Sequence, residues 1–391
     1  MAVTCSRLWI YIGHPENRRK QFFTQSLPDG ETLVVLSYQA LLAAPCLNSY
    51  LLHQLHGYEA GQWLVKIDSP GENFAVEKAL LSRAQPGQYD DLTFDKGCFR
   101  HLKFWFVAFR HLLLDLANTL QSLASSSQTR LTFLNTPEAI ITMTDKLSCQ
   151  RRLIDQQVPV PPLLPEMQNF EQLTDYMLTH RCRQVFVKTR YGSSASGVMA
   201  LRVHPDGRRM IARTSLELGT HGRFYNSLKI RTYQDRQAIA ACFDAIYSQQ
   251  GYCEHWLPKP QLAGLGFDLR ILVIDGRAAH HVTRCSRSPM TNLHLGNQRG
   301  DILQHPQGEM WLMQARQVAE QAAAAIPGGR CIGADVICGK SGLPANSASG
   351  SDSSEIQARV LELNAFGDLL PGIEFDGMDS CQAQIKALLC G

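Results

Sequence analysis

Two apolar stretches near the C-terminus, each with an acidic residue among hydrophobic ones, constrain the fold of this chain most strongly. Residues 331–337 contain a single acid, Asp335, and residues 358–364 contain Glu362 and Asn364. Because successive side chains on a strand point to opposite faces, Glu362 and Asn364 share one face. Two strands of a hairpin would place Asp335 beside Glu362.

The pattern of the second stretch separates polar from apolar positions. Glu362 and Asn364 alternate with Leu361 and Leu363, which we expect to pack on the opposite face. A carboxylate and an amide oxygen aimed at one point suit a hard cation such as Mg²⁺, which takes oxygen ligands and shares them with substrate phosphates. Together with Asp335 they form a candidate metal site. The simpler alternative is two ordinary strands whose polar residues face solvent.

The composition is that of an ordinary globular chain. The length of 391 residues favours two or three domains, and 45% of the residues are apolar while 19% are charged. A net charge of +3 does not favour nucleic acid or a membrane as a partner, and no run approaches the ~20 apolar residues of a membrane helix. The twelve cysteines form no Cys-x-x-Cys pair, which indicates free thiols in a reducing compartment. We therefore expect a cytoplasmic protein.

The N-terminal part has the pattern of an α/β domain. Apolar strands are expected at residues 8–12, 32–37 and 62–67, with helical segments between and after them. In open α/β sheets ligands gather where strands end and loops begin, so the turns at Gly13 and Ser69 are candidate ligand loops. As simple turns they need no function.

Three domains are expected along the chain. A long helical stretch at residues 98–124 is followed by a serine-rich linker at 125–128. Thr136 and Pro137 then form a typical helix start, with Thr136 as N-cap. The expected domains are residues 1–135, 136–257 and 258–391.

A strand that runs into a loop of small residues is a candidate phosphate site. The strand at residues 184–188 ends at Lys188 and leads to a loop closed by glycines at 192 and 197. Small residues let backbone N–H groups approach phosphate oxygens, and Lys188 adds a charge. A surface hairpin is the alternative. The candidate loop residues are Ser193, Ser194, Ala195, Ser196 and Gly197.

The segment after the helix at residues 233–250 is a candidate adenine site. Glu254, His255, Trp256 and Leu257 form a short extended segment. Its backbone can contact an adenine edge while Trp256 and Leu257 enclose the ring. Plain core packing explains the same residues.

A hairpin rich in arginine follows. The strand at residues 267–274 turns at Asp275-Gly276, and Asp268 and Arg270 share a face. Since guanidinium groups bind carboxylates and phosphates bidentately, the arginines of this region make a candidate anion site. The alternative is a solvated basic hairpin. The candidate polar residues beyond the turn are Arg284, Arg287, Asn292, His294 and Arg299.

Taken in order, these segments resemble the ATP-grasp superfamily, in its RimK-like and D-alanine–D-alanine-ligase-like branch. The resemblance covers roughly residues 140–375, and the α/β domain before it corresponds to a pre-ATP-grasp domain. It implies an α/β fold with an N-terminal pre-ATP-grasp domain and a two-lobed grasp. The segments that carry it are Asp145-Lys146, Lys188 with its loop, 254–257, Asp268-Leu269-Arg270, 288–294, Asp335 and Glu362-Leu363-Asn364.

The resemblance implies a role for each segment. Lys146 and Lys188 would contact the phosphates of ATP, and the small-residue loop would close over them. Residues 254–257 would hold adenine, and Asp268 would lie on the nucleotide side. Mg²⁺, or Mn²⁺ in its place, would be held by Asp335, Glu362 and Asn364. Arg270, Arg287 and Asn292 would face the reacting carboxylate.

The chain also departs from the pattern of this branch. After Asn364, where RimK-like ligases have a small residue, Pro and Gly, this chain has Ala365-Phe366-Gly367-Asp368, which indicates a remodelled acceptor side. Gln261 stands where many relatives place a ribose-binding acid. The chain looks most like a bacterial ATP-grasp family without an established substrate, which shares the segments 69–73 and 289–294.

These features predict an ATP-dependent ligase that joins a carboxylate to an amine, or to a thiol, through an acyl phosphate. The partners would be a small-molecule or peptide carboxylate and an amine acceptor; a homodimer is left open. Two alternatives remain at this stage. One is a kinase with the same fold, and the other is a regulatory protein that binds ATP without turnover.

Overall fold

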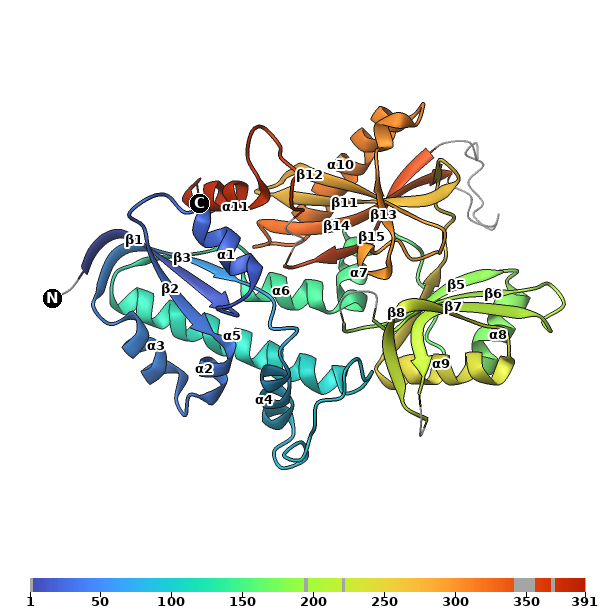
Figure 1. Cartoon of the computed structure of the whole chain (residues 1–391), viewed down its shortest axis with the longest axis horizontal. Helices are drawn as coiled ribbons and strands as arrows, with labels where there is room; N and C mark the ends of the chain where they lie inside the picture. The colour runs from blue at the N-terminus through green and yellow to red at the C-terminus, as the bar shows by residue number, and fades with distance from the viewer. Residues whose placement is uncertain (1–2, 193–195, 220–221, 341–355, 367–369, 391) are drawn as a thin grey trace.

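The structure is a computed structural model that describes residues 3–192, 196–219, 222–340, 356–366 and 370–390. Its strands form three sheets, each covered by helices on at least one face (Figure 1). The three sheets follow one another along the chain. Among the described residues, no helix is long and apolar enough to cross a membrane.

The first sheet is parallel, with the strand order β2-β1-β3-β4. Its central strand β1 is buried on both faces, which explains the continuous apolar run at residues 8–12. Leu8, Ile10 and Ile12 pack beneath α2–α5, and Trp9 and Tyr11 point to the opposite face. The bounds are β1 Val3–Gly13, α1 Arg18–Gln25, β2 Thr32–Ser37, α2 Tyr38–Ala43, α3 Leu47–Leu55, β3 Tyr58–Ile67, α4 Phe74–Ala84, α5 Leu102–Ser126 and β4 Arg130–Phe133.

The expected linker at residues 125–128 is wrong. Helix α5 continues to Ser126, and β4 begins at Arg130 as a fourth parallel strand beside β3. The serine run is therefore the last turn of a helix and a tight connection. The helix start at Thr136 is confirmed, because the Thr136 side chain accepts a hydrogen bond from the Ala139 N–H.

The second sheet is antiparallel, with the order β8-β7-β6-β5-β9. Val185 and Val187 of β5 pack against α8 and α9, so Phe186 and Lys188 point to the opposite face. The sequence analysis did not predict β6, β7 and β8. The bounds are α8 Phe170–Thr179, β5 Gln184–Thr189, β6 Val198–Val203, β7 Met210–Leu218, β8 Phe224–Tyr233, α9 Arg236–Ser248 and β9 Gly251–His255.

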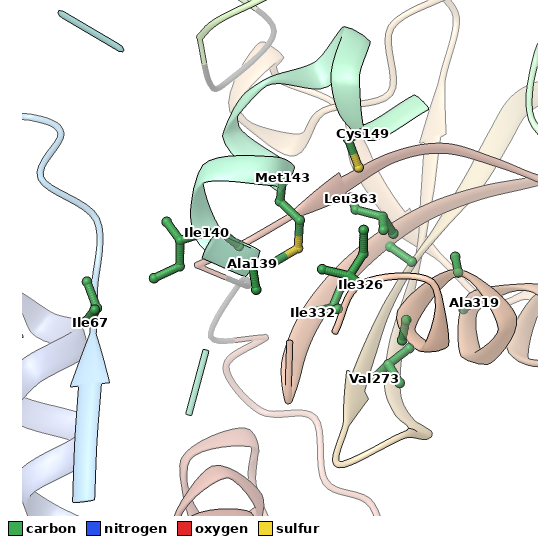
Figure 2. Close-up of a cluster of buried hydrophobic side chains, with 14 of the residues drawn as sticks. Ile67, Ala139, Ile140, Met143, Cys149, Val273, Ala319, Ile326, Ile332 and Leu363 are labelled. Carbon is green, nitrogen blue, oxygen red and sulfur yellow. The ribbon is translucent and has the colours of Figure 1, made fainter. Parts of the chain in front are cut away.

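The third sheet has the order β13-β12-β11-β14-β15, with β10 paired to β11. One of its faces carries Leu269, Ile271 and Val273, which pack with helix α10 in the largest core (Figure 2). The expected hairpin at Asp275-Gly276 is present. The bounds are β10 Gln261–Leu262, β11 Leu265–Ile274, β12 Arg277–Ser286, η2 Leu293–Leu295, β13 Gln298–Gly300, η3 Ile302–Gln304, α10 Gly308–Ala324, β14 Cys331–Lys340 and β15 Ile356–Asn364.

Two short helices join the second and third sheets to the first. Helix α6 (Pro137–Thr144) and helix α7 (Lys146–Asp155) meet at Asp145, whose side chain caps α7 through the Ser148 N–H. Figure 2 shows Ala139, Ile140 and Met143 of α6 near Ile332 and Leu363. This packing fixes the N-terminus of α7 close to β15.

The C-terminal helix α11 (Ser380–Cys390) lies against both α1 and β11 (Figure 1). Its Ile385 and Leu388 are buried with Trp9 of β1 and Leu272 of β11. It also receives the buried Lys66 of β3, whose Nζ donates to Gln384 Oε1 at 2.7 Å. Helix α11 therefore binds the first sheet to the third.

The Lys66–Gln384 contact gives a stability prediction. Gln384→Met is expected to lower the free energy of unfolding by about 1–3 kcal/mol, because a buried ammonium loses its hydrogen-bond acceptor. Urea denaturation would measure the change, with Lys386→Met on the exposed side of the same helix as control. A variant as stable as the control would show that Lys66 finds solvent or another acceptor at no cost.

Candidate functional site

The structure places the predicted acidic residues on one face of the third sheet. Asp335 of β14 lies opposite Glu362 of β15, and Gly333 lies opposite Asn364. On its other side Asp335 lies opposite Arg270 of β11. The expected pairing of Asp335 with Glu362 is therefore present, and the three oxygen donors share the face that points away from α10.

The expected position of Leu361 is wrong. The pairing of β14 with β15 shifts after Asp335, which lies opposite Glu362, while Val336 lies opposite Val360. Leu361 is the extra residue of this β-bulge, and a bulge turns side chains out of strict alternation. Leu363 is buried in the core as expected, whereas Leu361 is only half-buried; both leucines line a narrow cavity beside Glu362.

Each acid of this face is paired with a cation. Asp335, 3% exposed, accepts hydrogen bonds from Arg270 Nε at 2.5 Å and from Arg270 Nη2 at 3.3 Å. Arg284 Nη2 lies 3.1 Å from Asp335 Oδ2. Glu362 Oε2 accepts from Lys146 Nζ at 3.0 Å, so the first residue of α7 reaches across to β15. The predicted phosphate lysine and the predicted metal acid are thus in direct contact.

A second buried cluster continues from Arg284. Asp268, 1% exposed, lies 2.8 Å from Arg284 Nε and 2.8 Å from Lys259 Nζ, and it accepts a hydrogen bond from Thr291 Oγ1. Lys259 Nζ also lies 2.7 Å from Thr291 Oγ1. Lys259 is not among the residues predicted from the sequence, and Thr291 appears there only as part of segment 288–294. Asp268, which it placed on the nucleotide side, is closed off by these three partners.

The second sheet contributes Lys188 and Glu254 to the same region. Lys188 Nζ lies 2.5 Å from Glu254 Oε1, and Glu254 is 1% exposed. Within the part of the chain that the structure describes, the second carboxylate oxygen of Glu254 is buried and has no partner in full hydrogen-bond geometry, although the Gln150 side chain acts to lower the pKa of Glu254. A buried oxygen of this kind is a position where a ligand donor would be stabilising.

The pKa values of these acids reflect the balance of burial and charge. Burial raises the pKa of Glu362, but the charges of Lys146, Lys188 and Arg270 outweigh it and hold the pKa below its ordinary value. For Asp335 burial dominates, and its pKa is raised despite Arg270 and Arg284, with the charge of Glu362 adding to the rise. Burial likewise raises the pKa of Glu254 against the charge of Lys188.

The ion pairs described above carry a small positive excess. Five cationic side chains pair with four carboxylates. The cations are Lys146, Lys188, Lys259, Arg270 and Arg284, and the carboxylates are Glu254, Asp268, Asp335 and Glu362. An anion entering with a divalent cation can exchange partners with these pairs. Such an arrangement suits a polyphosphate better than a neutral ligand.

The predicted adenine segment lies at the end of β9. Trp256 is half-buried, with its ring 5.5 Å from that of Phe186 and 5.0 Å from the Arg202 guanidinium. The N–H groups of His255 and Trp256 donate to Pro162 and Gln184 carbonyls. His255 Nδ1 lies 3.4 Å from Cys182 Sγ, and Leu257 is half-buried. The backbone of residues 255 and 256 is therefore already occupied by protein contacts.

The predicted phosphate loop is described in part. Ser193, Ser194 and Ala195 lie outside the described residues, while Ser196 and Gly197 are inside them. Gly197 has φ +62°, and a Cβ there would lie 2.6 Å from the Phe99 ring, so this position requires glycine.

The base of this loop has an anchor that the sequence analysis missed. Arg190 donates from Nε and Nη2 to the two oxygens of Asp145, at 2.6 and 2.7 Å. The Lys146 N–H also donates to the Arg190 carbonyl at 3.0 Å. The bidentate contact joins the loop to the N-terminus of α7, where Lys146 stands.

Two predicted residues, Arg287 and Asn292, lie apart from the ion-pair network, as does Gln261, which stands where many relatives place a ribose-binding acid. Arg287 is exposed beyond the end of β12. Asn292 is half-buried at the start of η2, and its carbonyl accepts from Asn297 at 3.0 Å. Gln261 is exposed on β10, where it pairs with Gly266. The structure thus brings Arg270 into the network but not Arg287 or Asn292.

The space at the acids is small in this structure. A cavity of about 10 Å³ is lined by Lys146, Gln150, Tyr252, Leu361 and Glu362, together with neighbouring apolar residues. It admits no more than one water molecule.

The donor set nevertheless fits a magnesium ion. In the described residues, no three His, Cys, Asp or Glu side chains are grouped to hold a metal. The predicted set has two carboxylates and one amide, and strand pairing aligns them on one face. Hard oxygen donors of this kind, with open positions left for phosphate oxygens, are what Mg²⁺ uses in nucleotide sites.

Comparison with known proteins identifies the fold. No protein-family model matches the chain, and no curated protein sequence matches it. Among solved structures it is similar to the ATP-grasp ligase PsnB complexed with minimal precursor, at 16% identity and a TM-score of 0.51 over 98% of both chains. A complex of PsnB with a phosphomimetic precursor variant, Mg and ADP matches at 16% identity and a TM-score of 0.52, over 98% of this chain and 97% of that one.

A second enzyme has the same architecture. The D-cycloserine synthetase DcsG matches at 14% identity and a TM-score of 0.50, over 97% of this chain and 98% of that one. The chain therefore has the ATP-grasp fold, as its sequence predicted. The similarity extends over the N-terminal α/β domain as well as the two sheets that follow it.

Proposed function

We propose that this protein is an ATP-dependent ligase that activates a carboxylate with Mg²⁺-ATP and joins it to an amine. The carboxylate would be converted into an acyl phosphate with release of ADP, and the amine would displace the phosphate. The fold supports the class of enzyme, since PsnB and DcsG are a ligase and a synthetase with this architecture. The complex of PsnB with Mg and ADP supports the same nucleotide and metal here.

The observation that carries the proposal is the convergence of charge on Glu362. Lys146 from α7 contacts this carboxylate at 3.0 Å, Arg270 from β11 contacts Asp335 opposite it, and Lys188 from β5 contacts Glu254. The charges of all three cations lower the pKa of Glu362. The reaction has to bring a carboxylate against a polyanionic nucleotide, and two like charges about 4 Å apart repel by ~4 kcal/mol at an effective dielectric near 20. A site that gathers cations from three elements meets this requirement.

The residues have separate parts in this proposal. Asp335, Glu362 and Asn364 would hold Mg²⁺, which when bound would neutralise phosphate charge. Lys146 and Lys188 would leave Glu362 and Glu254 to bind phosphate oxygens. Residues 254–257 would hold adenine through the side chains of Trp256 and Leu257, since the N–H groups of residues 255 and 256 already bond to protein. The loop from Ser193 to Gly197 would cover the phosphates.

The arginines would serve the reacting carboxylate. Arg270 is partly buried beside Asp335, with 11% of its side chain exposed, and would turn one N–H toward an incoming acid. Arg287 and Asn292 lie beyond the end of β12, where they would contact the substrate once it is bound. No serine or cysteine nucleophile is needed, because the nucleophiles are the two substrates.

A trapping assay tests the reaction type. The protein is expected to release ADP in the presence of its carboxylate substrate, and hydroxylamine in place of the amine is expected to give a hydroxamate. Screening acids with Mg²⁺-ATP, with and without amines or thiols, would also identify the second substrate. A stable phosphorylated product that yields no hydroxamate would indicate a kinase, and failure to bind ATP would overturn both.

A further inference from the structure

Two consecutive backbone carbonyls directly after Asn364 are held by side chains from the N-terminal part of the chain. The Ala365 carbonyl accepts a hydrogen bond from Asn135 Nδ2 at 2.6 Å. The Phe366 carbonyl accepts one from Arg19 Nη1, also at 2.6 Å. Arg19 is distant in sequence from Phe366, so the contact joins α1 to the segment that follows β15.

Both polar atoms of the Asn135 side-chain amide form hydrogen bonds with backbone groups near Ala365. Nδ2 donates to the Cys331 carbonyl at 2.7 Å as well as to Ala365, and Oδ1 accepts from the N–H groups of Arg330 and Cys331, each at 2.9 Å. The residue is 4% exposed. A buried amide with four partners is held in one orientation, so it fixes the chain after Asn364 to the beginning of β14.

Arg19 is itself fixed by an acid at the end of β3. Its Nη1 lies 3.4 Å from Asp68 Oδ1, and Asp68 is 3% exposed. Asp68 accepts from Tyr11 Oη at 2.7 Å and from the Ser69 N–H at 2.7 Å. Tyr11, Asp68 and Arg19 therefore form a chain of hydrogen bonds from the first sheet to the Phe366 carbonyl.

We propose that Arg19 and Asn135 are positioning residues for the divalent cation, acting through the turn at Ala365 and Phe366. The inference rests on the proposed function, since it assigns to these residues the placement of Asn364 and Glu362. Strand β15 is an edge strand that ends at Asn364. The position of Asn364, the last proposed metal ligand on this strand, therefore depends in part on the contacts that hold Ala365 and Phe366.

The physical basis is the precision that a metal site demands. Partners behind the ligands orient them, and their loss typically weakens metal binding by about 10–100-fold. Without the hydrogen bond to Phe366, the turn gains conformational freedom, and the position of Asn364 is then held only by its pairing with Gly333 and by the Asn135 bond to Ala365. Asp68, at the end of β3, and Phe366, after β15, are linked through Arg19. A displacement of Asp68 would therefore also shift the segment that follows the proposed metal ligands.

The test compares neighbouring arginines on one helix. Arg19→Met removes the donor to Phe366, whereas Arg18→Met removes an exposed arginine that lies over the Phe22 ring. Binding of Mn²⁺ in the presence of ADP would be followed by electron paramagnetic resonance, with thermal unfolding measured on the same samples. Arg19→Met is expected to weaken Mn²⁺ binding by at least about tenfold relative to Arg18→Met, with similar melting temperatures.

Two further variants separate positioning from loss of structure. Arg19→Lys retains a donor and is expected to recover part of the Mn²⁺ affinity. Tyr11→Phe keeps the buried ring but removes one of the hydrogen bonds to Asp68, and is expected to change Mn²⁺ binding in the same direction by less. These graded effects would not follow from a purely structural role.

The outcomes distinguish the two proposals. If the unaltered protein binds no Mn²⁺ with ADP, the proposed function falls together with this inference. If it binds Mn²⁺ and Arg19→Met binds equally well, this inference alone is overturned. It is also overturned if all four variants change Mn²⁺ binding only in proportion to their melting temperatures.

Discussion

Glu362→Gln is expected to lower the rate of substrate-dependent ADP formation by on the order of 10²–10³-fold while the protein remains folded. Glutamine keeps the shape of the side chain but removes the charge on which Lys146, Lys188 and Arg270 converge. It would also offer Mg²⁺ a neutral oxygen in place of a charged one. The loss should therefore appear in turnover and in the Mg²⁺ concentration needed for half-maximal rate.

The measurement is steady-state ADP release across a Mg²⁺ titration. Glu171→Gln is a matched control, since Glu171 lies exposed on α8, where its partner Arg236 is 3.9 Å away. Circular dichroism would show whether the variant retains the fold. A Glu362→Gln protein with ordinary turnover and an unchanged Mg²⁺ requirement would remove Glu362 from the proposed metal site.

The sequence predicted the acidic pair because two local rules act together there. Side-chain alternation places Glu362 and Asn364 on one face, and a hairpin between two apolar strands brings Asp335 alongside. The same rule failed for Leu361 because it assumes an unbroken strand. The bulge at this residue depends on how β14 and β15 pair, which alternation within one strand cannot reveal.

Residues that complete the site through tertiary contacts were missed for a related reason. Lys259 lies in a short connection, and only the fold of β11 and β12 brings it to Asp268. Arg190 looks like an ordinary loop residue until the N-terminus of α7 lies beside it. Local patterns identify acids and lysines on strands, but they do not show which charge faces which.

The N-terminal domain shows the limit of motif-based reasoning most directly. The turns at Gly13 and Ser69 are candidate ligand loops because strands end there, or they are simple turns. The structure shows Asp68 engaged with Tyr11 and Arg19, and Arg19 engaged with the segment after the proposed metal ligands. Asp68 and Arg19 thus connect the N-terminal domain to the segment after β15. The spacing of residues within the N-terminal turns does not indicate this connection.

The largest expected effect on stability comes from the buried cluster around Asp268. Asp268→Asn is expected to lower the free energy of unfolding by about 3–5 kcal/mol near neutral pH, because it leaves buried cations without their counter-charge. Lys259 loses its carboxylate partner, and Arg284 keeps only Asp335. Urea denaturation of both proteins would measure the difference.

The pH dependence of this difference has a defined sign. Burial raises the pKa of Asp268, but Arg284 and Lys259 outweigh it, so the pKa in the folded protein lies below its unfolded value. A carboxyl group shifted in this direction stabilises the fold fully above its unfolded pKa, near 4, and loses that contribution as the pH falls further. The gap between the unaltered protein and Asp268→Asn should therefore be constant from pH 5 to 7 and narrow below about pH 4.

The titration of Asp335 does not change the expected narrowing of this stability difference at low pH. Its pKa is raised by burial, so on its own it favours the folded state more as the pH falls. Because Asp335 is present in both proteins, most of its effect cancels in the difference. The remaining effect arises from Arg284, which Asp268 and Asp335 share.

An exposed aspartate provides the comparison that makes the result specific. Asp206 contacts Arg209 at 3.1 Å on the surface, where solvent screens the pair, and Asp206→Asn is expected to leave the urea midpoint unchanged. If Asp268→Asn behaved like Asp206→Asn, the cluster would have to be open to water, which would let Lys259 and Arg284 solvate their charges. The binding face would then be a wet cleft, and its cations would be available to phosphate without first breaking buried ion pairs.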